Sequence, residues 1–435
     1  METSWRASRA AFMSGALVSG AVLTALAVSA CGTAGSGAGG AAATSPTATS
    51  GAATSAGATT GAASSASASV SASAVTPTGP ATGEAGGTAP PATGPAGGPV
   101  PGGFAADSVT FVSPQEAFVL GTAPCADAPC TSIVRTLDRG ASWRGLPAPV
   151  VPLGDSLAGA AGPAVWGIRF ADPDTGFVFG DGLWETTDGG EQWAKAASPG
   201  GSILSLEIID GQVLALTDTC TPNGGCAQTG ALLRRPLAGG AWQAVTPVPE
   251  PGTIATQARV AAILDGPDVL VTTDGGLTLA KRAAPCAPVG VTQAASVAVT
   301  GPDGLALVCA GDAAMGSVDK TVYVSDDLGA HWTEAGPAPR GGDPMGSSAA
   351  TPAQLVVAAA SGASELYYSA DGGARWSTAY SAGDGGLGFS DLGFTTAADG
   401  VVIHGPVLSD DNAEKRPGQL LLTSDGGASW QPVSF

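Results

Sequence analysis

Few side chains in this chain of 435 residues are suited to catalysis. It contains only two histidines, His331 and His404. His331 lies inside a turn-like phrase and His404 in a strand-like segment. Neither has a nucleophile at a spacing that indicates a nucleophile–base pair. We therefore expect no catalytic residues and no cofactor.

The seven cysteines are the other residues with evident chemistry. Six fall into neighbouring pairs, and in an exported protein such pairs predict disulfides. Zinc is the alternative, but Cys-x4-Cys and Cys-x5-Cys spacings without a nearby histidine disfavour it, so we expect no metal site. The predicted pairs are Cys125 with Cys130, Cys220 with Cys226, and Cys286 with Cys309.

One eight-residue phrase recurs along the chain and must position everything else. It consists of a hydroxyl residue, a gap, Asp, a gap, Gly, two further residues and Trp, and its clearest copy is 186–193. Asp favours turns through bonds to nearby backbone amides, and Gly supplies the positive φ of a short β-connection. The Asp and Trp positions are Asp138 and Trp143, Asp188 and Trp193, Asp327 and Trp332, Asp371 and Trp376, and Asp425 and Trp430. A sixth copy keeps Asp274 but ends in Leu279, and a seventh keeps Gly239 and Trp242 with Arg235 and Leu237 in the hydroxyl and Asp positions.

The phrase resembles the Asp box, or BNR repeat, of sialidase-like β-propellers. Its final positions are 50, 49, 37, 53, 44 and 54 residues apart, a period typical of four-stranded propeller blades. The sequence therefore predicts an all-β fold, a seven-bladed β-propeller over residues 104–435. Blade four has the least certain strand boundaries.

The N-terminal region resembles a segment for export and membrane anchoring. Residues 1–30 resemble a lipoprotein signal peptide, and the run ending at Cys31 resembles a lipobox, which implies that Cys31 is acylated. An uncleaved membrane helix is the alternative. Residues 31–103 are rich in Ala, Gly, Ser, Thr and Pro and are predicted to form a disordered linker. We expect a protein held on the outer face of the cytoplasmic membrane or in the cell envelope.

The acidic balance limits the partners. The formal net charge is −19, which argues against nucleic acid. An unidentified protein or glycan ligand remains, and we expect a monomer.

Two places are candidates for binding. Arg169 and Asp391 lie on predicted inner strands, where each is either a ligand contact or a satisfied structural hydrogen-bonder; we favour the structural interpretation. The densest charge cluster is the stretch 408–418, which is either a solvated loop or a contact site. Its candidate residues are Asp410, Asp411, Glu414 and Arg416.

Resemblance to sialidases does not by itself imply hydrolysis. In that family the boxes lie at the rim, whereas activity needs an arginine triad, a Tyr–Glu pair and a Phe/Tyr-Arg-Ile-Pro motif, which this chain lacks. The nearest string is Gly167-Ile168-Arg169-Phe170. We expect a non-catalytic binding or scaffold module, similar to the photosystem II assembly factor family. The alternatives are a sialidase-like or xyloglucanase-like glycoside hydrolase and a purely structural stalk. Facing carboxylates across the channel would favour the hydrolase.

Overall fold

The computed structural model describes residues 97–125, 130–154, 164–220, 226–248, 253–286, 293–405 and 418–435. The predicted signal peptide, Cys31 and the linker up to residue 96 lie outside the described residues. Within these ranges the chain is built from strands and turns, without a helix, so it holds no helix that could span a membrane.

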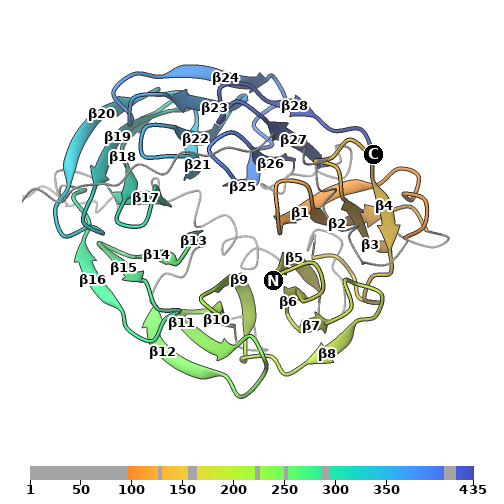
Figure 1. The fold of residues 1–435 in the computed structure, drawn as a ribbon. Coiled ribbons are helices and arrows are strands. Elements are labelled where there is room, and N and C mark those ends of the chain that lie inside the picture. Colours follow the sequence, from red (N-terminus) through yellow and green to blue (C-terminus); the bar gives the residue numbers. More distant parts are fainter. Residues whose placement is uncertain are drawn as a thin grey trace, which may run out of the picture. The chain divides into compact units, whose positions relative to one another are not determined.

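The described residues form seven four-stranded antiparallel sheets, each made of four consecutive strands, and the sheets are arranged as blades around an axis (Figure 1). This confirms the predicted seven-bladed propeller. Blade one comprises β1 (Ala105–Phe111), β2 (Ala117–Ala123), β3 (Cys130–Thr136) and β4 (Arg144–Leu146). Blade two comprises β5 (Val165–Phe170), β6 (Gly176–Gly180), β7 (Leu183–Thr186) and β8 (Ala194–Ala196). Blade three comprises β9 (Ser202–Ile209), β10 (Gln212–Cys220), β11 (Cys226–Pro236) and β12 (Gln243–Val248).

The remaining blades follow the same plan, with the first strand at the axis and the fourth at the rim (Figure 1). Blade four comprises β13 (Ile254–Gln257), β14 (Val260–Asp265), β15 (Asp268–Thr272) and β16 (Ala280–Ala283). Blade five comprises β17 (Gln293–Val299), β18 (Leu305–Ala314), β19 (Ser317–Ser325) and β20 (Thr333–Ala338). Blade six comprises β21 (Asp343–Ala349), β22 (Leu355–Ala360), β23 (Ser364–Ser369) and β24 (Ser377–Ala382). Blade seven comprises β25 (Phe389–Phe394), β26 (Gly400–His404), β27 (Gln419–Thr423) and β28 (Gln431–Pro432).

The recurring phrase forms the turn between the third and fourth strands. In the clearest copy, Thr186 Oγ1 donates to Asp188 Oδ1 at 2.8 Å and accepts the amide of Gly190 at 2.9 Å. Asp188 Oδ1 also accepts the amide of Gln192, four residues ahead, because Gly189 and Gly190 at positive φ turn the chain back. The same hydroxyl–Asp and hydroxyl–Gly bonds recur in the copies that begin at Thr136, Thr272, Ser325, Ser369 and Thr423.

The seventh copy, in blade three, is held by different chemistry. Arg235 occupies the hydroxyl position, and its Nη2 donates to Glu185 Oε2 of blade two at 2.9 Å. Its guanidinium carbon lies 5.3 Å from the ring centres of both Phe177 and Trp242. An ion pair with two cation–π contacts thus replaces the hydroxyl–Asp bond, and it joins blade three to blade two.

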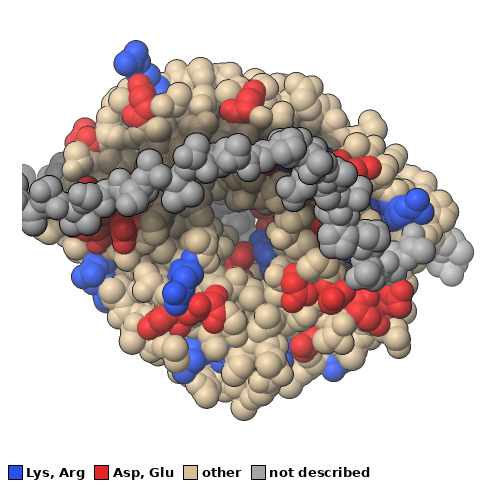
Figure 2. Space-filling model, in the orientation of Figure 1, with Lys and Arg blue, Asp and Glu red and all other residues tan. Residues whose placement is uncertain are grey.

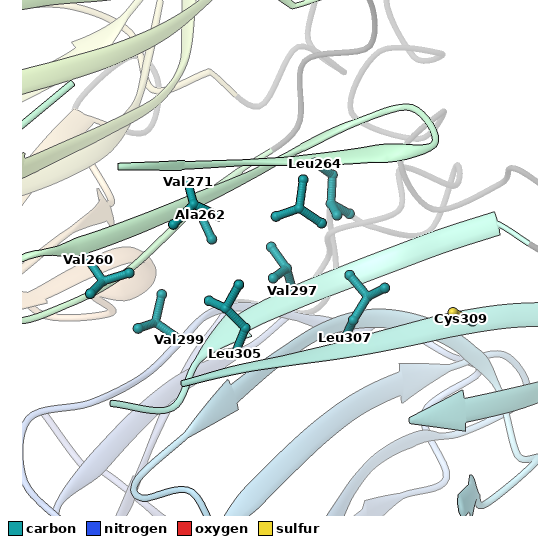
Figure 3. Packing of buried hydrophobic residues seen from close by; sticks show 10 residues of the cluster. Val260, Ala262, Leu264, Val271, Val297, Val299, Leu305, Leu307 and Cys309 are labelled. Carbon is teal, nitrogen blue, oxygen red and sulfur yellow. The ribbon is translucent and has the colours of Figure 1, made fainter. Parts of the chain in front are cut away.

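The hydrophobic core is divided among the interfaces between blades. β14 is buried along its whole length: Val260, Ala262 and Leu264 face blade five, whereas Ala261 and Ile263 face blade three. Successive side chains of a strand point to opposite faces, so a sheet packed between two others needs apolar residues at consecutive positions. Figure 3 shows the cluster between blades four and five. Each of the seven interfaces among the described blades holds one such cluster.

Two of the three predicted disulfides are confirmed. Cys125 is bonded to Cys130 across the β2–β3 connection, and Cys286 is bonded to Cys309. The second bond crosses from the segment after blade four to β18 of blade five, where Cys309 is buried in the core cluster. It therefore ties the segment that follows blade four to the second strand of blade five. The side chains of Cys220 and Cys226 lie outside the described residues, although their backbones pair at the end of β10 and β11.

Candidate functional site

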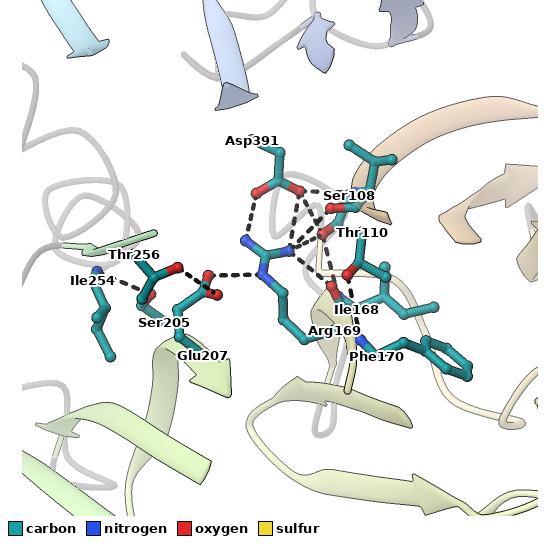
Figure 4. Close-up of polar contacts among 11 residues, drawn as sticks. Ser108, Thr110, Ile168, Arg169, Phe170, Ser205, Glu207, Ile254, Thr256 and Asp391 are labelled. Carbon is teal, nitrogen blue, oxygen red and sulfur yellow. Dashed lines mark hydrogen bonds and ion pairs between the residues drawn. The ribbon is translucent and has the colours of Figure 1, made fainter. Parts of the chain in front are cut away.

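A group of four polar side chains, three of them charged, comes from the first strands of four different blades. Arg169 is on β5, Glu207 on β9 and Asp391 on β25, and all three belong to the first strand of their sheet. Ser108 on β1 completes the group. Because the first strands converge at the axis, residues far apart in sequence meet there (Figure 4).

Arg169 lies between the two carboxylates. Its Nη2 donates to Asp391 Oδ1 at 2.9 Å, and its Nε donates to Glu207 Oε1 at 2.8 Å. The remaining guanidinium nitrogen, Nη1, donates to the carbonyl oxygen of Ile168 at 2.7 Å and to that of Val109 at 3.3 Å. The three charged side chains are each less than one-fifth exposed. The structure thus brings the predicted candidates Arg169 and Asp391 into direct contact and adds Glu207.

Burial and pairing act differently on the two acids. Burial raises the pKa of Glu207 above its ordinary value, and Arg169 offsets only part of that effect. Burial acts in the same direction on Asp391, but Arg169, Ser108 and the amide of Val109 outweigh it and hold its pKa below the ordinary value. The pKa of Arg169 is raised, because its two carboxylate partners overcome desolvation. Asp391 is therefore held as a carboxylate against Arg169, whereas burial works against ionisation of Glu207.

A second polar cluster lies where blade six passes into blade seven. His404 Nε2 lies 2.6 Å from Asp384 Oδ2, and His404 Nδ1 lies 3.3 Å from the hydroxyl of Tyr380. Ser364 Oγ donates to the same Asp384 oxygen, and the amide of Gly388 donates to Ser364. Burial opposes ionisation of Asp384, yet these bonds keep its pKa below the ordinary value.

Asp384 and His404 line a cavity of about 520 Å³. Its other walls are largely apolar and come from the segment 100–104 that precedes β1 and from Leu387, Val433 and Phe435. This size is typical of pockets that take a small ligand or a partner side chain. The arrangement does not match a Ser-His-Asp triad, because Ser364 contacts the aspartate rather than the histidine.

The structure does not test the remaining predicted binding residues. Asp410, Asp411, Glu414 and Arg416 lie outside the described residues. In the described ranges no group of three or more His, Cys, Asp or Glu side chains is placed to hold a metal ion. On the face shown in Figure 2, acidic side chains gather in groups around the ring and the middle of the ring is hollowed.

The fold defines the protein as a β-propeller, and solved structures share it. A structure described as YCF48 bound to D1 peptide is 17% identical, with a TM-score of 0.50, over 74% of this chain and 93% of that one. YCF48 from Cyanidioschyzon merolae is 14% identical with a TM-score of 0.49, over 75% and 97%. The GH74 enzyme of Niastella koreensis is 12% identical with a TM-score of 0.28, over 75% and 71%. At 17% identity, the likeness to the YCF48 structure bound to D1 peptide shows the fold alone.

No family model matches the chain, and no curated protein matches it.

The sequence pointed to Arg169 and Asp391 one at a time but not to Glu207 or Ser108. Those two residues are on β9 and β1, in segments where alternate polar residues are ordinary for a strand. Only a charge or a hydroxyl on the first strand of a blade could have indicated these two residues. Which strand is first in its blade becomes known only with the order of the strands.

Proposed function

We propose that this protein is a non-catalytic binding or scaffold module that acts outside the cytoplasm, attached to the membrane by lipid at Cys31. The observation that carries the non-catalytic part is the position of Arg169 between Glu207 and Asp391. A glycoside hydrolase needs a gap between its two carboxylates for the scissile bond and its water or nucleophile. Here the guanidinium of Arg169 occupies that gap, so Glu207 and Asp391 do not form an open acid–base pair.

Two further observations support binding as the role. The cavity beside Asp384 and His404 is large enough for a small ligand or a side chain, and it is mostly apolar. The similar YCF48 structure is bound to D1 peptide, so this fold is compatible with a peptide partner.

The hydrolase alternative is favoured by one observation, the opposite pKa shifts of Glu207 and Asp391. The exported chain with Cys31→Ser, which avoids acylation, separates the alternatives. We expect no turnover of a panel of fluorogenic glycosides, together with binding on a glycan or peptide array. Turnover that disappears in both Glu207→Gln and Asp391→Asn would establish the hydrolase. Absence of both turnover and binding would favour the structural stalk.

Attachment to the membrane is tested separately. In cells that express the full chain and are fed an alkyne-tagged fatty acid, we expect the tag on the wild-type protein and not on Cys31→Ala. A tag retained by Cys31→Ala, or absent from both proteins, would contradict a lipid anchor at Cys31. This result does not depend on what the propeller binds.

A further inference from the structure

Neighbouring blades are joined at the axis by a recurring polar contact. The amide of Ile168 in β5 donates to Ser108 Oγ in β1 at 3.2 Å. The amide of Ile254 in β13 donates to Ser205 Oγ in β9 at 3.2 Å. In both cases a side-chain oxygen on the first strand of one blade accepts a backbone amide from the first strand of the next blade.

Between blade seven and blade one the same contact is made by a carboxylate. The amide of Val109 in β1 donates to Asp391 Oδ2 at 2.8 Å, and Ser108 Oγ donates to the same oxygen at 2.6 Å. An ionised acceptor makes shorter and roughly twice stronger hydrogen bonds than a neutral hydroxyl. The strongest version of the contact therefore lies between the first and last blades.

That interface is where the chain gives the ring no continuous connection. In the described residues each sheet consists of four consecutive strands, so blades one and seven do not share a strand. Besides the bonds of Asp391, this seam between blades seven and one holds an apolar cluster and the bond from the amide of Ala106 to the carbonyl of Gly418. It also holds the ion pair of Arg139 with Asp399 and the edge contacts of Phe435 with Phe104 and Trp143. All of these are non-covalent contacts.

The backbone at Asp391 is adapted to this contact. Asp391 has φ of +51°, and it lies in an irregularity of the β25–β26 pairing between Ser390 and Gly393. A positive φ is unfavourable for a residue with a side chain, and such a conformation persists only where surrounding contacts stabilise it. Here the carboxylate gains bonds to blade one and, through Arg169, to blade two.

We propose that Asp391 is the clasp that closes the propeller: it fastens blade seven to blades one and two at the axis in place of a shared strand. Arg169 extends the fastening to Glu207 of blade three. The seam between blades seven and one is then the interface most sensitive to the loss of one side chain.

Hydrogen–deuterium exchange on the full exported chain with Cys31→Ser tests this proposal. In Asp391→Ala we expect amides of 105–111 and 418–423 to exchange at least about tenfold faster, since a hydrogen bond to a charged group is lost. Glu185→Ala is the matched control, because it breaks the ion pair of Arg235 between blades two and three. We expect the control to accelerate exchange at that interface and not at the seam.

Two results would overturn the clasp: seam exchange in Asp391→Ala equal to that of the parent chain, or an acceleration spread evenly over all interfaces. Should Asp391→Ala fail to fold, Asp391→Asn is measured in the same way. It retains an acceptor for the Val109 amide but loses the charge, so we expect a smaller acceleration that is still confined to the seam. Exchange indistinguishable from the parent chain in Asp391→Asn would likewise reject the proposal.

Discussion

Nη2 of Arg169 lies 2.9 Å from Oδ1 of Asp391, a residue 222 positions further along the chain. The contact joins the second blade to the last one. Both side chains are less than one-fifth exposed, so each partner depends on the other for compensation of its charge.

The strength of this pair can be measured by a double-mutant cycle. We expect Arg169→Met and Asp391→Asn each to lower the free energy of unfolding by about 2–3 kcal/mol, because each leaves charged or polar partners uncompensated. The double variant should lose about 1–2 kcal/mol less than the sum of the single losses. Urea denaturation provides the values. Additive losses below about 0.5 kcal/mol each would mean that the pair has no structural role.

The Trp residues of the recurring turns form two groups according to the carbonyl that accepts the indole N–H. We expect replacement of the Trp to have different effects in the two groups. Trp193 Nε1 donates to the carbonyl of Pro147, which follows blade one, whereas Trp376 Nε1 donates to Gly373 within its own turn. We expect Trp193→Phe and Trp376→Phe each to cost about 1 kcal/mol in urea denaturation. Only Trp193→Phe should also accelerate amide exchange in β4 of the preceding blade. Equal behaviour of the two variants in that strand would contradict the grouping.

We predict that placing the hydroxyl residue of the recurring phrase at position 235 of blade three lowers the free energy of unfolding. Arg235→Thr supplies the hydroxyl found in six other copies, yet it leaves Glu185 unpaired and Leu237 still offers no carboxylate. We expect a loss of about 2–4 kcal/mol in free energy of unfolding, with about 1 kcal/mol recovered when Leu237→Asp is added. Arg234→Thr, which alters the neighbouring exposed guanidinium, is the control and should cost less than about 0.5 kcal/mol. A neutral or stabilising Arg235→Thr would refute the ion-pair account of this turn.

The environment of Lys320 predicts that the free energy of unfolding depends on pH. Its side chain is buried, and its Nζ donates to the carbonyls of Val318, Gly341 and Gly342 at 3.3, 3.0 and 2.7 Å. Desolvation lowers its pKa from 10.5 to about 8, outweighing nearby acids. Because the unfolded chain binds more protons between these values, the contribution of Lys320 to the free energy of unfolding rises with pH across that window.

We expect this rise to be about 2 kcal/mol between about pH 8 and pH 9.5 for the wild type, and to be absent from Lys320→Met. Lys281→Met is the matched control, since Lys281 is more than half exposed, and it should retain the rise. The measurement is urea denaturation at each pH. A rise that persists unchanged in Lys320→Met would show that another group is responsible.

The sequence predicts the structure well where that structure depends on local contacts. Thr186, Asp188 and Gly190 satisfy one another within five residues, so the turn could be recognised from spacing alone, and its repetition predicted the blades.

The channel wall could not be predicted in the same way. Arg169 and Asp391 were recognisable as unusual charges, but their pairing depends on which strands reach the axis and on how the ring closes. Glu207 carried no local signal that distinguished it from other acids. The partnership of Asp384 with His404 likewise arises from the passage between two blades, 20 residues apart in sequence.

A crystal structure of the full chain with Cys31→Ser tests the central claim most directly. The account predicts seven four-stranded sheets in residues 97–435, with the guanidinium of Arg169 between the carboxylates of Glu207 and Asp391. A different number of sheets would contradict it. So would a withdrawn guanidinium that leaves the two carboxylates facing each other across an open gap.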